Sequence, residues 1–282
     1  MKIAVITDSS AFLPDETKNR DNLFILDVPI TIDGETYFEG KNLTNEEFYK
    51  KMAASSELPK TSQPSLSELE NLLDKLKSEN YTHVLGFFLS KGISGFYQNS
   101  YYLQSEYDDM KVHFFDTKIT SAPLGYMVTT ALELIDKGQD FTEISKKIDY
   151  IIEKTRTFII VDDLNHLVKG GRLTNGAALF GSLLNIKPIL EFDNNGEIVV
   201  FEKIRTSKKA YKRLISIFKE LSSQEKCKIF IVYSEDDTRA LDIKKSMEKE
   251  ELGNVNLASF GAIIGTHLGN GAVGFAISPE VD

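Results

Sequence analysis

The feature of this 282-residue sequence that most restricts its fold is a repeated unit, in which a short apolar run ends in small polar residues and a helix pattern follows. The clearest case is residues 82–89, an aromatic-rich run of the buried-strand type, which leads into the polar stretch 90–100. Residues 1–10 and 112–117 have the same form. Since strands separated by helices usually lie parallel, the unit predicts a parallel sheet flanked by helices, with ligands at the carboxyl ends of its strands.

The second half of the chain has a different pattern, rich in hairpins. Residues 186–192 and 198–204 alternate in polarity on either side of Asn194-Asn195-Gly196, a strong hairpin signal. Further strands are expected near 228–233, 255–260 and 272–277, and helices at 207–221 and 237–250. We therefore predict an α/β protein of two domains: residues 1–156 with a mainly parallel sheet flanked by helices, and residues 157–282 of the α+β type with a mostly antiparallel sheet.

The composition excludes several classes of partner. There are 33 Lys and Arg residues against 42 Asp and Glu residues, a net charge of −9, so a nucleic-acid backbone is a disfavoured partner. The single cysteine, Cys227, excludes an internal disulfide framework and a multi-cysteine zinc site. The apolar run 3–6 is too short for a signal peptide, and no apolar stretch approaches membrane-spanning length, so we expect a soluble, cytoplasmic protein without stable membrane insertion.

The stretch that contains Ser94 and Gly95 is the first candidate site. It lies where the strand 82–89 ends and a helix is expected to begin, a position at which free backbone N–H groups and the positive end of the helix dipole favour an anion. Ser94 adds a hydroxyl donor, and Gly95 lets the backbone approach a ligand closely. The alternative is that Ser94 only caps the helix.

Other candidates lie on predicted loops. Thr61 and Ser62 are hydroxyl residues on a loop stiffened by Pro59 and Pro64, for which plain turn chemistry is the alternative. His267 lies in Gly265-Thr266-His267-Leu268-Gly269, which we interpret as a loop too rich in glycine for a helix.

Two arginines also stand out from the other charged residues. Arg172 follows Gly170-Gly171, a predicted helix end, and Arg205 follows a predicted strand. Solvated surface charge is the alternative for both.

Known catalytic and nucleotide motifs fit poorly. Residues 269–274 match G-x-G-x-x-G but lead into a strand near the end of the chain, where no βαβ unit can follow. Residues 92–96 miss the G-x-S-x-G pattern because Phe96 occupies the last position. No P-loop and no paired metal-ligating histidines occur, so no cofactor is expected on this chain.

Taken together, several segments resemble the DegV family: Thr7-Asp8-Ser9-Ser10, residues 61–65, residues 94–97, residues 161–173 and residues 266–274. They span nearly the whole chain in the family's order. The family usually has Thr where Phe96 stands and Pro where Asn270 stands.

The resemblance implies that one long-chain fatty acid is buried between the two domains. It implies a fatty-acid-binding subunit of a bacterial fatty acid kinase rather than an enzyme in its own right. A separate kinase, which carries ATP and its metal, would phosphorylate the bound carboxylate to give an acyl phosphate for phospholipid synthesis.

The resemblance also implies roles for particular residues. Thr61 and Ser94 would hold the carboxylate, with His267, Ser62 and Gly95 at the same end, and Arg172 and Arg205 would lie near the mouth where the kinase docks. Two rival functions are a stand-alone hydrolase, with Ser94 as nucleophile and His267 as base, and a regulator that binds lipid and reports it to a partner.

Overall fold

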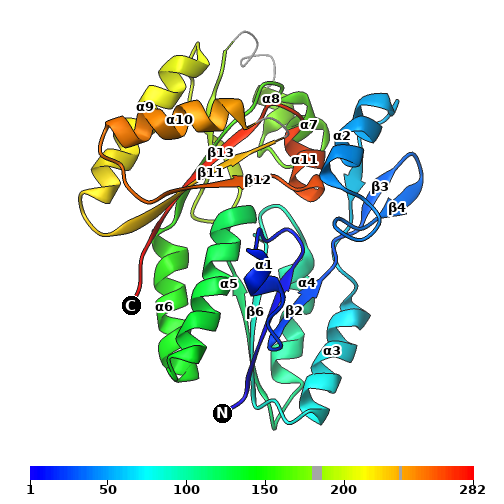
Figure 1. Cartoon of the computed structure of the whole chain (residues 1–282). Coiled ribbons are helices and arrows are strands. Elements are labelled where there is room, and N and C mark those ends of the chain that lie inside the picture. Colours follow the sequence, from blue (N-terminus) through cyan, green and yellow to red (C-terminus); the bar gives the residue numbers. More distant parts are fainter. Residues whose placement is uncertain (180–185, 235–236) are drawn as a thin grey trace.

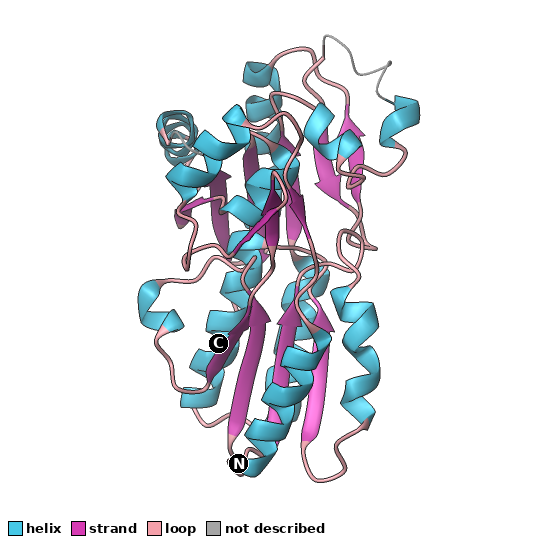
Figure 2. Ribbon diagram, turned by 90° about the vertical axis from the view of Figure 1, so that its right-hand side faces the viewer, coloured by secondary structure: helices cyan, strands magenta, loops and turns pink. Residues whose placement is uncertain are grey.

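The two main sheets of the chain lie one above the other, with helices packed around them (Figures 1 and 2). The computed structural model describes residues 1–179, 186–234 and 237–282. In Figure 1 the N-terminus lies at the lower end of the lower half, and the chain returns from the upper half to place the C-terminus beside α6.

The lower sheet is parallel throughout, as predicted. Its strand order is β2-β1-β6-β7, and each neighbouring pair is parallel. The strands are β1 (Ile3–Asp8), β2 (Leu23–Leu26), β6 (His83–Phe88) and β7 (Lys111–Asp116). Successive side chains of a strand face opposite sides of a sheet, so Phe87 and Phe88 of β6 enter two different hydrophobic clusters.

Helices cover both faces of the lower sheet. One face packs against α3 (Leu66–Ser78), α4 (Phe96–Ser100) and the 3₁₀ helix η1 (Tyr101–Ser105). The other packs against α5 (Ser121–Asp136), which is buried along most of its length because it also contacts β11 and β13 of the upper sheet. Beside α5 lies α6 (Phe141–Lys154), and a short helix, α1 (Asp15–Lys18), follows β1.

The upper sheet is mixed, and all but one of its neighbouring pairs are antiparallel. The order is β10-β9-β8-β13-β11-β12, with β11 and β12 as the parallel pair. The strands are β8 (Arg156–Ile160), β9 (Ile189–Phe192), β10 (Ile198–Glu202), β11 (Cys227–Tyr233), β12 (Val255–Ser259) and β13 (Val273–Pro279). The predicted fold class is therefore confirmed.

In the described part of the chain, five helices accompany the upper sheet. The apolar faces of α9 (Ser207–Ser222) and α10 (Thr238–Lys249) pack on its outer side. To the right of α10 in Figure 1 lie α7 (Asn165–Lys169), α8 (Gly176–Leu179) and α11 (Ala262–Leu268). Gly171 adopts φ +69°, which agrees with the predicted helix end at this position.

An excursion from the N-terminal half packs against α11. It consists of β3 (Ile30–Ile32), β4 (Glu35–Tyr37), α2 (Asn45–Ala54) and β5 (Lys60–Thr61), which form a small antiparallel sheet and one helix. The hairpin turn at Asp33-Gly34 and the Thr44–Glu47 capping box both agree with their local sequence patterns, an Asp-Gly pair between two strands and a Thr followed three residues later by Glu. Residues 25–32 have the apolar pattern of a single strand. Instead, the chain leaves the lower sheet after Leu26 and pairs again at Ile30 in the small sheet, on either side of Pro29.

The predicted division at residue 156 stays a prediction. The strands of the lower sheet all precede it and those of the upper sheet begin at it, but the excursion lies against the upper half. One large hydrophobic cluster runs without a break from Phe87 and Phe115 of the lower sheet to Ile159 and Val232 of the upper sheet. In the described part of the chain, no helix has the length and apolar character needed to cross a membrane.

Candidate functional site

A cavity of about 180 Å³ lies inside the continuous core, between the two sheets. Most of its wall is aliphatic or aromatic, with side chains from the lower sheet, the upper sheet and α11. Leu89 and Ile119 follow β6 and β7, while Ile159, Val232 and Phe275 come from β8, β11 and β13. The cavity thus lies at the carboxyl edge of the parallel sheet, where the sequence predicted a ligand.

Six of the seven predicted site residues line this cavity, and one does not. Those that line it are Thr61, Ser62, Ser94, Gly95, Arg172 and His267. Arg205 is exposed in the link between β10 and α9 and is not part of the wall that the described residues form.

The centre of the polar end is a contact between two segments far apart in sequence. His267 Nε2 lies 2.7 Å from Thr61 Oγ1, so that one of these groups donates to the other, depending on the tautomer. His267 Nδ1 is buried and has no hydrogen-bond partner among the described residues. Burial lowers the pKa of His267 to about 3, with smaller contributions from the charges of Arg172 and His166. The imidazole is therefore neutral near pH 7 and does not supply a positive charge to the cavity.

His267 lies in the last turn of α11, not in a loop, so that part of the sequence prediction is wrong. The helix contains a single glycine, Gly265, at which a Cβ would lie 2.8 Å from atoms of Phe48 and Tyr49. The glycine therefore permits close packing of α11 on α2, and this tertiary contact compensates for its poor helix propensity.

Ser94 caps locally while it lines the cavity. Its Oγ accepts the N–H of Phe96 at 3.3 Å, at the start of α4. The capping interpretation and the ligand interpretation are compatible, because this bond uses an oxygen lone pair and the hydroxyl proton can still be donated. The N–H groups of Ile93 and Ser94 both bond to Ser90 O. Side-chain hydroxyls, more than the backbone N–H groups invoked from the sequence, thus remain as donors for an anion.

Thr61 belongs to a two-residue strand and not to an irregular loop. β5 pairs with β3 through Thr61 and Ile30, which fixes the backbone beneath the hydroxyl. Gln63 extends the same wall and accepts a hydrogen bond from Asn99 Nδ2 at 2.8 Å. The excursion from the N-terminal half therefore delivers its polar residues to a helix of the C-terminal half.

Arg172 joins the two halves at the cavity wall. Its Nε donates to Ile93 O at 3.2 Å and its Nη1 donates to Gly170 O at 2.6 Å. The side chain is half-buried, and burial lowers the pKa of Arg172 from its ordinary value, although a guanidinium stays cationic in proteins. The guanidinium thus lies beside Ser94 rather than extending into solvent.

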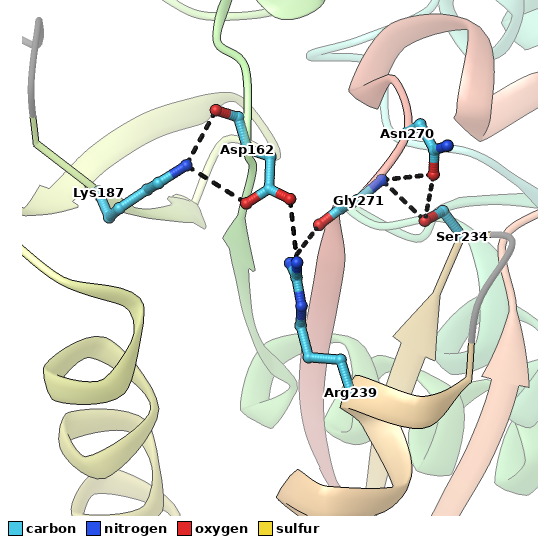
Figure 3. Close-up of polar contacts among 6 residues, drawn as sticks. All are labelled: Asp162, Lys187, Ser234, Arg239, Asn270 and Gly271. Carbon is cyan, nitrogen blue, oxygen red and sulfur yellow. Dashed lines mark hydrogen bonds and ion pairs between the residues drawn. The ribbon is translucent and has the colours of Figure 1, made fainter.

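A second polar cluster supports the chain just beyond His267 (Figure 3). Asp162 Oδ2 accepts from Arg239 Nη2 at 3.1 Å, and Arg239 Nη1 donates to Gly271 O at 2.8 Å. On the other side the Gly271 N–H donates to Ser234 Oγ at 3.0 Å, and Lys187 Nζ donates to the Asp162 backbone at 3.0 Å.

Gly271 is required in this cluster. Its φ is +77°, and a Cβ would lie 2.3 Å from Asp162 Oδ2. The cluster therefore anchors the turn that ends α11, and with it the position of His267.

Sequence reasoning missed the contribution of the β9–β10 hairpin. Phe192 and Ile198 line the cavity, and Gly196 O accepts a hydrogen bond from Ser90 Oγ at 2.7 Å. The hairpin itself was predicted, but no local signal indicates which loop it contacts, because its partner is 106 residues away. Among the described residues, no group of three or more His, Cys, Asp or Glu side chains is placed to hold a metal ion.

The fold and the site together define an α/β protein with two main sheets and a mostly apolar cavity between them, in whose wall Thr61 and His267 are hydrogen-bonded. A family model described as "Uncharacterised protein, DegV family" matches residues 2–280. A DegV domain-containing protein of Streptococcus pneumoniae is 51% identical over 282 residues, which cover 100% of both chains. The chain belongs to the DegV family.

Two solved structures extend this comparison. A fatty acid binding DegV family protein from Streptococcus agalactiae superposes with a TM-score of 0.97 at 52% identity, with 100% of each chain covered. DegV from Bacillus subtilis, described as a fatty acid binding protein, gives a TM-score of 0.89 at 36% identity over 99% of this chain and 100% of its own. The chain is thus similar over its whole length to proteins that bind fatty acids.

Proposed function

We propose that this protein binds one long-chain fatty acid in the internal cavity and presents its carboxylate to a separate ATP-dependent kinase. The observation that carries the proposal is the cavity itself, whose wall is mostly apolar and includes Thr61, Ser94 and His267. The protein's membership of the DegV family and its similarity to fatty-acid-binding proteins also support a fatty acid as the ligand.

The chemistry of the polar end suits a carboxylate. A buried carboxylate without hydrogen bonds would be too costly to desolvate, and the hydroxyls of Thr61 and Ser94 can donate to it. A neutral His267 can orient the Thr61 hydroxyl from the other side. The half-buried guanidinium of Arg172 adds a positive charge close to the same end.

The kinase partner would complete the reaction in the cytoplasm. The proposed product is an acyl phosphate that feeds phospholipid synthesis, with ATP and its metal held by the kinase and not by this chain. Arg172 at the cavity wall and the exposed Arg205 would offset repulsion between the carboxylate and the γ-phosphate of ATP. In this scheme the chain is a binding subunit and not an enzyme.

A stand-alone serine hydrolase is less compatible with the geometry. His267 Nε2 is engaged by Thr61, and Ser94 Oγ accepts the N–H of Phe96. A histidine with a pKa near 3 is also a weak general base at neutral pH. A lipid-sensing regulator would use the same cavity and differs only in its partner.

The test is native mass spectrometry of the full chain after incubation with a series of fatty acids, followed by addition of a fatty acid kinase and ATP. One bound acid per chain, and acyl phosphate only when the kinase is present, are the expected results. A chain that stays empty overturns the proposal. Hydrolysis of fatty acyl esters or thioesters by the chain alone would favour the hydrolase, and bound acid that no kinase phosphorylates would favour the regulator.

A further inference from the structure

One hydroxyl in the wall of the cavity takes no part in the contacts described above. Two side-chain polar atoms of the wall are buried without a hydrogen-bond partner among the described residues, namely His267 Nδ1 and Thr157 Oγ1. His267 is engaged with Thr61 through its other ring nitrogen, whereas Thr157 has a single polar atom in its side chain. Thr157 is only 8% exposed, so water outside the protein does not satisfy its hydroxyl.

Thr157 faces the cavity from a row of aliphatic side chains. Alternate residues of a strand face opposite sides of the sheet. Phe158 and Ile160 of β8 belong to the hydrophobic cluster beneath α9 and α10. Ile159 and the following Val161 belong to the cluster that surrounds the cavity. Thr157 is on the same side as Ile159 and lines the cavity, so it places a hydroxyl where its neighbours on that face are apolar.

This part of the wall is separate from the contact between Thr61 and His267. His267 lies against Gly170 at the end of α7, where a Cβ would be 3.1 Å from His267 Nδ1. Because α7 follows β8 along the chain, this contact lies toward the carboxyl end of β8. Thr157 is near the amino end, three residues before Ile160, which is roughly 10 Å along the strand. An oxygen atom hydrogen-bonded to Thr157 would therefore belong to a different group from a carboxylate beside His267.

The side chains on either side of Thr157 offer its hydroxyl no partner. On β13 the paired residue is Ala276. On β9, Glu191 pairs with Phe158, so the next residue in the register, Phe192, lies beside Thr157. A buried water is typically held by about three hydrogen bonds, which alanine and phenylalanine side chains do not provide. The surroundings thus favour a partner that is itself held in the cavity by apolar contacts.

A buried hydroxyl without a partner destabilises the protein that contains it. Its removal from water is not compensated by a hydrogen bond, whereas valine, which has nearly the same shape, would fill the position of Thr157 without this cost. A ligand that carries a hydroxyl at this point of the cavity would supply the missing partner. The hydroxyl of the ligand would in turn be satisfied within a mostly apolar wall.

We propose that Thr157 is a subsite for a hydroxyl group on the acyl chain, and that the protein binds a hydroxy fatty acid in preference to the unsubstituted acid. This inference rests on the proposed function and names the subclass of fatty acid. The two hydroxyls form one hydrogen bond, and no covalent step is involved. A chain hydroxyl that meets the aliphatic wall instead would be buried without a partner and would weaken binding.

A series of positional isomers tests the subsite by affinity. The probes are stearate, 3-hydroxystearate, 10-hydroxystearate, 12-hydroxystearate and 17-hydroxystearate, measured by titration calorimetry. At least one isomer is expected to bind the wild type more tightly than stearate does. The same isomer should bind Thr157→Val about tenfold more weakly than the wild type, because the variant removes the hydrogen bond and leaves the ligand hydroxyl unsatisfied. Stearate is expected to bind both proteins equally.

Two further variants separate the effect of the hydroxyl from that of the side-chain shape. Thr157→Ser keeps the hydroxyl and is expected to keep the preference for the same isomer. Thr142→Val, at an exposed position in α6, is the matched control and should bind every probe as the wild type does. In urea unfolding without ligand, Thr157→Val should have a midpoint equal to that of the wild type or higher, because valine removes an unpartnered buried hydroxyl.

The outcomes separate this inference from the proposed function. Wild-type protein that binds neither stearate nor any hydroxystearate would overturn the proposed function. Bound stearate without a preferred hydroxystearate, or a preference that Thr157→Val retains, would overturn the subsite alone. The subsite is also wrong if Thr157→Val unfolds at a lower urea concentration than the wild type, since water or the fold then satisfies the hydroxyl. An equal loss of affinity for stearate and for the hydroxystearates would likewise contradict it, since Thr157 would then act on every fatty acid.

Discussion

The carboxyl ends of two strands, β1 in the lower sheet and β8 in the upper sheet, carry carboxyl groups in opposite environments. At the edge of the lower sheet Asp8 is fully buried and accepts the N–H groups of Ser10 and Leu89 and the Ser10 hydroxyl, at 3.0, 2.8 and 2.5 Å. At the edge of the upper sheet Asp162 is 38% exposed and is paired with two cations, Arg239 and Lys187. The Asp8 carboxyl group is therefore stabilised by hydrogen bonds in the absence of water, whereas the Asp162 carboxylate is stabilised by ion pairs that are partly exposed to water.

The difference explains which edge forms the apolar cavity. Burial raises the pKa of Asp8, and its hydrogen bonds with Ser10 and Leu89 act against that rise. Asp8 is not among the described residues that line the cavity, so its carboxyl group adds no charge to the wall. Thr120, which lines the cavity, donates to Ser10 Oγ at 2.9 Å and ties the wall to this network. The ionic cluster lies outside the cavity, where water screens it and where it anchors the turn behind His267.

The largest expected effect is the loss of the buried carboxyl group. Asp8→Ala would leave the N–H groups of Ser10 and Leu89 buried without an acceptor, at a cost of about 2 to 4 kcal/mol in the free energy of unfolding. Urea unfolding measures this, with the exposed Asp15→Ala as control. A loss below about 1 kcal/mol would mean that water or a rearrangement satisfies the two N–H groups. The stated difference between the environments of Asp8 and Asp162 would then be wrong.

The second-largest effect is expected on the affinity for fatty acid. If the neutral hydroxyls anchor the carboxylate, Thr61→Ala and Ser94→Ala should each weaken fatty acid binding by about 1.5 to 3 kcal/mol, the worth of a hydrogen bond to a charged group. Titration calorimetry with palmitate measures this, and Ser67→Ala, at an exposed position outside the cavity, is the control. If both variants bind fatty acid as tightly as the wild type does, Ser94 only caps α4 and Thr61 only forms part of β5.

The pH dependence of stability gives a third test. The folded-state pKa of His267 is about 3 and the ordinary value is 6.5, so the unfolded chain binds a proton that the folded chain refuses between these values. Stability should therefore fall as the pH is lowered below about 6.5, by about 1 to 2 kcal/mol at pH 5 from this group.

The comparison with His267→Gln isolates this contribution, because the other histidines are common to both proteins. Urea unfolding at pH 7.5 and pH 5 should show a smaller loss in the variant. Parallel losses in the two proteins would mean that His267 is protonated in the fold, and that the polar end of the cavity is cationic.

The smallest effect is expected in the ionic cluster. Asp162→Ala should cost about 1 kcal/mol or less, because its ion pairs are partly exposed, and the difference from the wild type should shrink at high salt. Unfolding at low and high salt measures this. A loss as large as that of Asp8→Ala, insensitive to salt, would contradict the distinction between the two edges.

Local patterns in the sequence determined the elements and much of the polar end. The strand units of the lower sheet, the hairpin at Asn194-Asn195-Gly196 and the capping box at Thr44 all follow from neighbouring residues, and the structure contains each of them. Thr61 and His267 were singled out as polar residues on predicted loops, and Ser94 as a hydroxyl at a predicted helix start, while their roles at a carboxylate were implied only by the resemblance to one family.

Only the tertiary structure decided how these elements meet. Thr61 and His267 are 206 residues apart, and their contact exists because the excursion of β3, α2 and β5 packs on α11. The same packing makes a helix of the glycine-containing segment around Gly265, against its local propensity. Arg172 in the cavity wall, Arg205 outside it, and the Thr157 hydroxyl that has no partner among the described residues are likewise consequences of long-range burial, which no local pattern of residues encodes.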